Sequence, residues 1–569
     1  MQHLTETERA LAVPRRNYTD TDLTLELMLP GRNRTWVDRY GRTVDGLRPI
    51  QSLALSAIRD AEGGFFPIAV GGGKSVIAGL AGTILGKKLA IILAPARTVP
   101  QLRATLADWG QHFRMPHYRV ESYAQLSRPR PTNLLQDLLG DVKPEDAVII
   151  CDEMHRLRYL SSARTKRLIR LFQQHPQLRF IGLSGTITAA GLRDFAHLLE
   201  LALREKAPMP LDAQHSSGGH LHAWAEVIDV KGQPDRYHWQ QIQPLLDQFG
   251  EGPAPTRYAE KRAYARSAFQ KRLESAPGVV CTKKTALGAS LNIQPLTVAV
   301  PEQIQAAIRR LNETDTLPNG DPVVDDISKW RASRQLSAGF AYFWDWPGGV
   351  PDWDWLDAKR NWDSHVRREL LQHSTDGYDS PALVERETRA GGRPHLEAPL
   401  GEWLAQKHKP QPPTSPLWLS DFLIQAARLW VAQQEDPVLV WYESQAVAHA
   451  LATYLPVYGA GDEAPPTVES CGVSIRAQGE GLNLHDWRVS LVLEPPSSGS
   501  VWEQMLGRTH RPGQLADEVD AHVFQHTTPY QDALVKARSK SAYIEATTGN
   551  QQKLCYATWL DPKKVSAKP

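Results

Sequence analysis

The sequence predicts an α/β protein with two lobes, each built on a parallel β-sheet that helices cover on both faces. Short apolar runs followed by turn signals occur in two separate regions of the chain. The expected strands are Leu89–Ala94, Ala147–Cys151 and Phe180–Leu183 in the first region, and Val438–Trp441 and Val489–Leu493 in the second. Segments compatible with helices lie between them, namely Ser75–Leu85, Ala163–Phe172 and Ala446–Leu455. Continuous apolar runs are typical of strands buried on both faces, and their alternation with helices favours parallel order. We therefore expect the lobes at residues 45–200 and 416–545.

Three further segments complete the predicted organisation. Residues 1–44 form an N-terminal arm, residues 201–415 a mostly helical and irregular insertion, and residues 546–569 a C-terminal tail. The insertion is rich in Pro, Gly and Trp, and helices are expected at Ala263–Leu273 and Gln303–Leu311. The segment Gln411–Pro416 has the composition of a linker into the second lobe. The tail, with Lys563 and Lys564, is expected to be mobile.

Composition excludes several classes of protein. The 569 residues allow about three to five domains. With 65 Lys and Arg against 63 Asp and Glu, the chain is not a strongly basic, histone-like binder, although a local basic groove remains possible. The four Cys form no CxxC pair, which rules out a zinc ribbon and fits a reducing compartment. We find no signal peptide and no apolar run near the ~20 residues that span a bilayer, so we expect a cytoplasmic protein without membrane contact.

A glycine-rich loop is the sharpest motif. It follows the apolar stretch Phe65–Val70 and precedes the first predicted helix, and it consists of Gly71, Gly72, Gly73, Lys74 and Ser75. Glycines let the backbone point its N–H groups at phosphate oxygens, and the helix adds its positive end. Lys74 would reach the β- and γ-phosphates of a nucleotide, and the Ser75 hydroxyl would hold Mg²⁺. Ile68 occupies the first glycine position of the full motif, and a plain glycine-rich turn is the alternative.

An acidic pair closes the predicted strand Ala147–Cys151. The segment is Asp152-Glu-Met-His155. A carboxylate at the carboxyl end of a parallel strand faces the ligand crevice, where Asp152 could coordinate Mg²⁺. Glu153 could polarise a water for attack on a γ-phosphate, and His155 could link this site to the neighbouring lobe. The alternative is an acidic helix N-terminus that satisfies free backbone amides.

Further segments carry a resemblance to a known family. These are Leu47-Arg-Pro-Ile-Gln51, Ser184-Gly-Thr186, Gly479-Glu-Gly-Leu-Asn-Leu484, and Gln504-Met-Leu-Gly-Arg-Thr-His-Arg511 with Pro-Gly-Gln514 after it. In this order, with the glycine loop and the acidic pair, they resemble the motifs of superfamily 2 helicases. The LRPxQ, GLNL and HRPGQ elements are most similar to Swi/Snf-like ATPases, and the compact form resembles DEAD/DEAH-type helicases of bacteriophages. The resemblance covers both lobes and not the insertion.

The resemblance implies a P-loop NTPase with two RecA-like lobes that bind ATP and Mg²⁺ between them. The implied nucleotide-binding residues are Arg48, Gln51, Gly71, Gly72, Gly73, Lys74, Ser75, Gly481 and Gln504, with Ser75 and Asp152 at Mg²⁺. Glu153, Asp152, Lys74, Arg508 and Arg511 would act in hydrolysis, and His155, Ser184 and Thr186 would couple hydrolysis to lobe movement. Arg508 and Arg511 are three residues apart, so on a helix they would share a face and both point into the cleft. A solvated helix face is the alternative for these arginines, and a small-residue turn for Ser184 and Thr186.

The family also implies contact with a nucleic-acid backbone, without sequence readout. Arg97, Ser122, Tyr123 and the Gly479–Gly481 segment match the contacting elements. The basic stretches Met154–Arg170 and Arg257–Lys284 could add contacts, and a solvated helix face is the alternative for each. The Trp and Asp residues of Tyr342–Trp346 and Asp352–Trp355 favour a folded core or a protein-contact surface, because the carboxylates would repel phosphates.

These expectations define three candidate functions. The first is an ATP-dependent DNA helicase or translocase, in the host cytoplasm if the protein is phage-encoded, and DNA is preferred by analogy with the HRPGQ and GLNL elements. The second is an RNA helicase that uses the same ATP site. The third is a nucleotide-gated DNA-binding scaffold with little catalysis, which the complete set of catalytic residues disfavours. We find no constellation typical of a nuclease or a methyltransferase.

Overall fold

The computed structural model of the chain divides into two compact units. Unit 1 comprises Met1–Ala286 and Arg538–Tyr556, and unit 2 comprises Leu287–Ala537 and Ala557–Pro569. Residues 201–286, predicted as part of the insertion, therefore belong to unit 1. The structure describes residues 4–17, 21–38, 41, 43–69, 71–128, 134–185, 191–211, 219–282, 289–321, 323, 325–372, 380–459, 461–463, 465–478, 483–511 and 513–565. In these residues, no helix is both long enough and apolar enough to span a bilayer.

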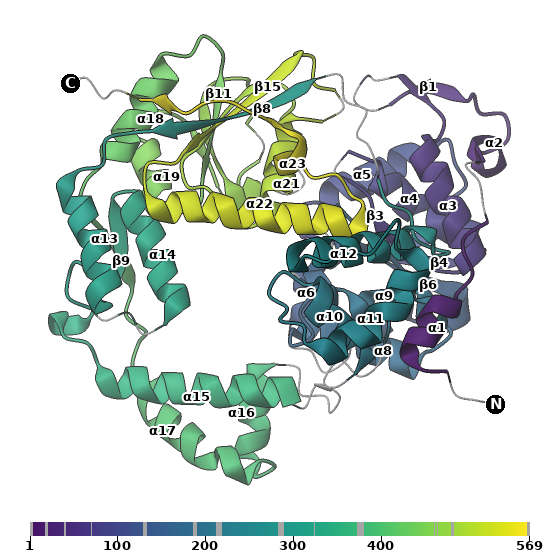
Figure 1. The fold of residues 1–569 in the computed structure, drawn as a ribbon, viewed down its shortest axis with the longest axis horizontal. Coiled ribbons are helices and arrows are strands. Elements are labelled where there is room, and N and C mark those ends of the chain that lie inside the picture. Colours follow the sequence, from purple (N-terminus) through teal and green to yellow (C-terminus); the bar gives the residue numbers. More distant parts are fainter. Residues whose placement is uncertain are drawn as a thin grey trace. The chain divides into compact units, whose positions relative to one another are not determined.

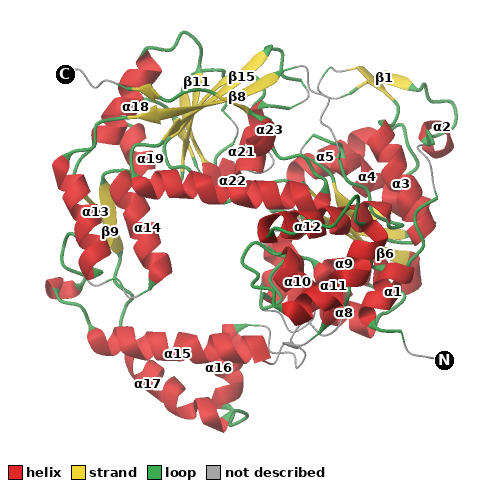
Figure 2. Ribbon diagram, viewed as in Figure 1, coloured by secondary structure: helices red, strands yellow, loops and turns green. Residues whose placement is uncertain are grey.

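Unit 1 is built on a five-stranded parallel sheet with the strand order β3-β7-β6-β4-β5. Figure 1 labels β3, β4 and β6 of this sheet, and Figure 2 shows β6 in yellow among red helices. Its strands are β3 (Gly64–Pro67), β4 (Leu89–Ala94), β5 (His117–Ser122), β6 (Ala147–Asp152) and β7 (Arg179–Ser184). The three strands predicted in this region are confirmed as β4, β6 and β7. The apolar runs of β4 and β6 are continuous because every residue of both strands is buried, as expected for strands covered on both faces.

Alternate residues of these strands enter two different cores. Leu89, Ile91 and Leu93 pack on one face of the sheet with α6 (Tyr123–Ser127), α7 (Leu134–Leu139), α8 (Ala163–Gln174), α9 (Ala196–Leu203), α10 (His220–Ile228), α11 (Arg236–Phe249) and α12 (Tyr258–Ser275). Ala90 and Ile92 pack on the other face with α3 (Pro49–Ala61), α4 (Lys74–Ile84) and α5 (Val99–Trp109). Short elements of the N-terminal region are α1 (Glu6–Ala12), α2 (Thr24–Leu27), β1 (Thr35–Val37) and β2 (Thr43–Asp45).

The second basic stretch predicted from the sequence has a structural role in unit 1. Arg262 Nε donates to the carbonyl of Val227 (2.9 Å) and Arg266 Nε to that of Ile228 (2.8 Å), so α12 caps the carboxyl end of α10. Arg272 is fully buried and donates to the carbonyl of Ala10 in the N-terminal arm (2.6 Å). These guanidinium groups satisfy backbone carbonyls, which neither of the two alternatives for this stretch anticipated.

The first basic stretch is also partly internal. Lys166 and Arg167 of α8 are buried, and Arg167 Nη1 donates to the carbonyl of Leu126 (2.8 Å). These two cations are therefore not part of a solvated face, and the burial argues against their direct contact with a nucleic acid.

Unit 2 contains a second all-parallel sheet, with the order β12-β13-β11-β14-β15-β8-β16 and with β17 also paired to β8. Its strands are β8 (Ser290–Thr297), β11 (Val438–Tyr442), β12 (Val457–Tyr458), β13 (Cys471–Ser474), β14 (Val489–Val492), β15 (Glu518–Phe524), β16 (Thr558–Trp559) and β17 (Lys563–Lys564). Its helices include α18 (Phe422–Ala432), α19 (Gln445–Leu451), α20 (Ile475–Gln478) and α21 (Gly499–Thr509). The prediction of an α/β protein with two parallel sheets is thereby confirmed.

Two predictions for the chain segments around this sheet are wrong. The tail predicted to be mobile instead supplies β16 and β17, because β8 presents an edge to which Lys563 and Lys564 add. The predicted linker Gln411–Pro416 overlaps β10 (Thr414–Trp418), which pairs antiparallel with β9 (Phe340–Trp344).

Helices surround the β9–β10 pair within unit 2. They are α13 (Glu302–Thr314), α14 (Asp326–Ser337), α15 (Trp353–Gln372), α16 (Pro381–Arg389) and α17 (Glu397–Lys407). The predicted helix Gln303–Leu311 is confirmed within α13. The ring of Trp355 is buried against Trp344, Trp346 and Trp403, with centroid separations of 5.9 to 6.2 Å. This packing agrees with the folded core, one of the two predicted alternatives, for these rings, whereas Trp353 is exposed.

The chain returns from unit 2 to unit 1 within a single helix, α22 (Thr528–Thr548), which α23 (Lys553–Tyr556) follows. In its unit 1 part, the Tyr543 hydroxyl donates to Asp229 Oδ1 (3.0 Å), which also accepts the backbone N–H of Leu192 (2.8 Å). Burial raises the pKa of Asp229 to about 7, although both hydrogen bonds act to lower it.

We expect the substitution Asp229→Asn to remove a pH dependence of unit 1 stability. Because the pKa of Asp229 is raised from 3.8 to about 7, the folded state holds a proton that the unfolded state releases. The free energy of unfolding of the wild type should therefore fall by about 2 to 4 kcal/mol as the pH rises from about 4 to 7. The amide cannot ionise and should abolish this fall. Denaturant-dependent hydrogen exchange of α10 peptides measures it, with the exposed Asp247→Asn as the control; an unchanged pH slope in Asp229→Asn contradicts the assignment.

Candidate functional site

The glycine loop lies between β3 and α4 in unit 1. The backbone N–H of Ile68 donates to the carbonyl of Ser184 (3.1 Å), and that of Ala69 to Thr282 Oγ1 (3.1 Å). Gly73 is the N-cap residue of α4, so the helix begins at Lys74 as the motif predicts. The loop is thus held by these two hydrogen bonds where it leaves β3. It then leads into the N-terminus of α4, which is the positive end of the helix dipole.

Glycine is required in this loop for two different reasons. Gly71 and Gly73 have φ values of 86° and 81°, in the left-handed region that disfavours other residues. A Cβ at Gly73 would also collide with the side-chain amide of Gln51, and a Cβ at Gly72 would collide with the side chain of Ile68. Any larger residue would therefore displace either the loop or the groups that support it.

Arg48 and Gln51, predicted to contact the nucleotide, contact the loop itself. Arg48 Nη1 donates to the carbonyl of Gly71 (2.7 Å), and Gln51 Nε2 to that of Gly73 (3.4 Å). Gln51 Oε1 meanwhile accepts the backbone N–H of Arg48 (2.8 Å) and caps the start of α3. Gln51 is 2% exposed, so its side chain holds the loop and the helix together.

Lys74 points back over the loop toward the acidic pair. Its Nζ lies 3.2 Å from the carbonyl oxygen of Ile68 and 3.6 Å from Glu153 Oε1. Lys74 is 9% exposed. The loop lysine and the predicted catalytic carboxylate, distant in sequence, therefore meet at one place.

Glu153 has an unusual backbone conformation at the end of β6. Its φ of 55° and ψ of 51° are left-handed, which is costly for a residue with a Cβ and is concentrated at functional sites. The turn carries the side chain to Ser184, whose Oγ donates to Glu153 Oε2 (3.2 Å). His155 Nδ1 lies 2.9 Å from the same Ser184 Oγ and 3.3 Å from Glu153 Oε2. The predicted coupling residues His155 and Ser184 thus contact the carboxylate directly.

Two residues predicted to contact nucleic acid, Tyr123 and Ser122, are buried and bonded within unit 1. Tyr123 is 2% exposed, and its hydroxyl donates to the carbonyl of Asp152 (2.8 Å). Burial raises the pKa of Tyr123, so the hydroxyl keeps its proton for this bond. Ser122 is the N-cap of α6 and accepts the backbone N–H of Gln125 (3.3 Å). Arg97, by contrast, is partly exposed in the loop between β4 and α5.

Ser75 and Asp152 have the ligand chemistry that Mg²⁺ prefers, a hydroxyl and a carboxylate. Ser75 is the second residue of α4, and Asp152 ends β6. Among the described residues, no group of three or more His, Cys, Asp or Glu side chains could hold a metal ion. A hydroxyl and a carboxylate are ligand types that can hold Mg²⁺ together with phosphate and water oxygens.

The predicted residues of the second lobe lie on or near α21 in unit 2. Gln504 and Arg508 are buried in this helix, which ends at Thr509. The prediction that Arg508 and Arg511 share a helix face is wrong, because Arg511 lies beyond the helix end. Thr186 and Gly481 lie outside the described residues, as do Glu480 and the rest of the Gly479–Gly481 segment.

A small cleft of about 260 Å³ in unit 2 contains Gln504 together with residues that the sequence analysis did not predict. Glu443 bridges Arg334 of α14 (2.9 Å) and Arg476 of α20 (2.7 Å). Glu443 directly follows the buried strand β11, which is the signal that identified Asp152. Arg334 lies inside α14, in the segment predicted as the insertion, and does not follow a buried strand.

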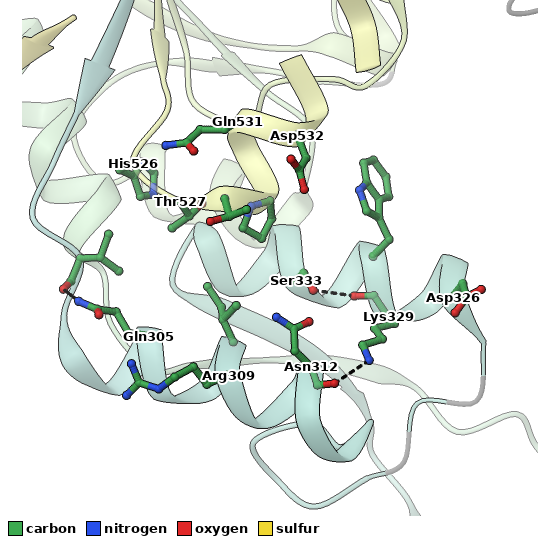
Figure 3. Close-up of a pocket in the computed structure, with 15 residues that line it drawn as sticks. Gln305, Arg309, Asn312, Asp326, Lys329, Ser333, His526, Thr527, Gln531 and Asp532 are labelled. Carbon is green, nitrogen blue, oxygen red and sulfur yellow. Dashed lines mark hydrogen bonds between the residues drawn. The ribbon is translucent and has the colours of Figure 1, made fainter. Parts of the chain in front are cut away.

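The larger cleft of unit 2, about 760 Å³, lies between α13, α14 and the start of α22 (Figure 3). Lys329 and Arg309, which line it, already have partners within unit 2. Lys329 Nζ contacts Asp315 Oδ1 (2.6 Å) and the carbonyl of Asn312 (3.0 Å), and Arg309 pairs with Glu302 (2.5 Å). The catalytic motifs do not line this cleft, so the site in unit 1 is the stronger candidate.

The comparisons with known proteins identify no family for this chain. No protein-family description matches it, and no curated protein is recognisably similar to it in sequence.

Proposed function

We propose that the chain is an ATP-dependent DNA helicase or translocase whose hydrolytic centre is the site in unit 1. The observation that carries the proposal is the meeting of Lys74 with Glu153, 3.6 Å apart, at a glycine loop that opens a helix. A phosphate loop, a cation and an orientated carboxylate are the parts that phosphoryl-transfer enzymes share. The two parallel sheets support the finer proposal that each unit contains a RecA-like lobe.

Each residue of the site has a chemical task under this proposal. The loop N–H groups and Lys74 would bind the β- and γ-phosphates of ATP, and Ser75 and Asp152 would hold Mg²⁺. Mg²⁺ would neutralise charge on the phosphates. Glu153 would orient the attacking water, and Ser184 and His155 fix its carboxylate for that task. Arg508 and Arg511 would add positive charge as the transition state develops.

We expect Glu153→Gln to lower the turnover number for ATP by about 100- to 1,000-fold, because the amide orients water poorly and accepts no proton. Nucleotide binding should persist in this variant, since the loop and Lys74 are unchanged. Lys74→Ala should instead weaken ATP binding by at least about tenfold. Steady-state phosphate release and titration with a fluorescent ATP analogue measure the two effects separately.

The exposed Glu145→Gln in the same unit is the matched control and should behave as the wild type. Unchanged turnover in Glu153→Gln would remove the catalytic basis of the proposal. Binding without turnover in the wild type would favour the nucleotide-gated scaffold.

We expect Arg508→Ala to reduce turnover by about 1,000-fold with little change in ATP affinity, as for the loss of an arginine finger. Arg508 belongs to unit 2 and the phosphate loop to unit 1, so this variant tests whether both units act on one nucleotide. The exposed Arg428→Ala on α18 serves as the control in the same assay. If Arg508→Ala retains full turnover, then hydrolysis does not need the second unit's guanidinium.

Stimulation of ATP turnover should identify the polymer. We expect DNA to stimulate more strongly than RNA, with a response independent of sequence and weakened by salt, because backbone contacts release counterions. A panel of duplex DNA, single-stranded DNA and RNA, each at two salt concentrations with Lys74→Ala as the blank, measures this. If RNA alone stimulates turnover, the proposal of a DNA motor is wrong and the RNA helicase takes its place.

A further inference from the structure

The carboxyl end of α22 places the side chain of Asn550 in the interior of unit 1. The helix ends at Thr548, and Gly549 takes a left-handed conformation with a φ of 71°. A Cβ at Gly549 would collide with the side chains of Glu274 and Gln270. The backbone N–H of Gly549 still donates to the carbonyl of Glu545 (2.9 Å). A glycine is thus required here, and it turns the chain so that Asn550 leaves the helix axis.

Asn550 is 1% exposed and is held by its neighbours. Its backbone N–H donates to Thr548 Oγ1 (3.3 Å), and its carbonyl accepts Gln552 Nε2 (3.0 Å). The N–H of Gln552 in turn donates to Glu545 Oε2 (2.9 Å). Buried polar groups are costly unless they are bonded, so this network fixes the position of Asn550.

The side chain of Asn550 reaches the residue that follows Ser184. Asn550 Nδ2 donates to the carbonyl of Gly185 at 2.6 Å. Ser184 itself donates from Oγ to Glu153 and accepts the N–H of Ile68 on its carbonyl, at the entrance to the phosphate loop. One turn therefore connects Asn550 with both the carboxylate and the loop.

We infer that Asn550 is a positioning residue for hydrolysis, which acts through Gly185 and Ser184 on the carboxylate of Glu153. This inference rests on the proposed function and names an element that regulates the same site. Asn550 is reached through α22, a continuous helix that begins in unit 2 and ends in unit 1. A change in the position of this helix is transmitted to Gly185 by a single short hydrogen bond.

The rival interpretation is that Asn550 only satisfies a buried carbonyl and so stabilises unit 1. The two roles differ in what they change. A purely structural role predicts a lower unfolding temperature with normal turnover in the folded protein. A positioning role predicts lower turnover in a protein that is still folded, with unchanged ATP affinity, because the loop and Lys74 are intact.

The test compares Asn550→Asp and Asn550→Ala with wild type and with Gln551→Ala, a partly exposed neighbour, in the full chain. Asn550→Asp keeps the shape but points a carboxylate at a carbonyl, and Asn550→Ala removes the contact. We expect both to lower the DNA-stimulated turnover number about tenfold, with a KM for ATP within twofold of wild type. Amide hydrogen exchange in the peptide that contains Ser184 and Gly185 should accelerate about tenfold, and Gln551→Ala should change neither.

Wild-type turnover that depends on Lys74 is established first. Its absence would overturn the proposed function, and with it this inference. If the wild type is active, normal turnover in folded Asn550 variants overturns the inference alone, and so does a loss of folding in both variants, which would leave Asn550 a structural role. Reduced turnover with unchanged exchange at Ser184–Gly185 would also overturn it, because the effect would then not pass through this turn.

Discussion

The candidate site depends on the order of three parallel strands. β3, β7 and β6 are neighbours in the unit 1 sheet, and their registers place Pro67 opposite Ser184 and Asp152 opposite Leu183. Since parallel strands all end at the same edge, the segments that follow them are brought together there. The glycine loop follows β3, Ser184 ends β7, and Glu153 follows β6. A different strand order would separate these groups whatever their sequences.

The local backbone conformation then orients the groups that the strand order brings together. Of the left-handed residues at this edge, Glu153 directly follows β6, and Gly71 and Gly73 lie in the loop between β3 and α4. Glycine adopts this conformation without strain, whereas Glu153 adopts it at a cost of about 1 to 3 kcal/mol. Its contacts with Ser184, His155 and Lys74 offset that cost in the folded protein.

The sequence predicts those strands that consist of an unbroken apolar run, because this signal is local. Fully buried parallel strands need unbroken apolar runs, as in Leu89–Ala94, and a carboxylate directly after such a run marks a strand end, as Asp152 does at the end of β6. Side-chain partners distant in sequence are not predictable in this way. Nothing local distinguishes an Arg that caps a helix, such as Arg262, from an Arg on a solvated face. The pairing of Lys563 with β8 has no local signal either, because it depends on an edge that another segment leaves open.

Unit 1 is made of two stretches of chain that are far apart in the sequence, a constraint that the sequence motifs do not reveal. Its last elements come from residues 538–556, and Tyr543 enters the same core as the helices that cover the sheet. Tyr543 and Asn550 of this segment bond to Asp229 and to Gly185, respectively. The first attaches the segment beside the carboxyl end of α10, and the second attaches it beside the turn that holds Glu153. The geometry of the carboxylate is therefore tied to a part of the chain that is synthesised only after the whole of β15 and α21.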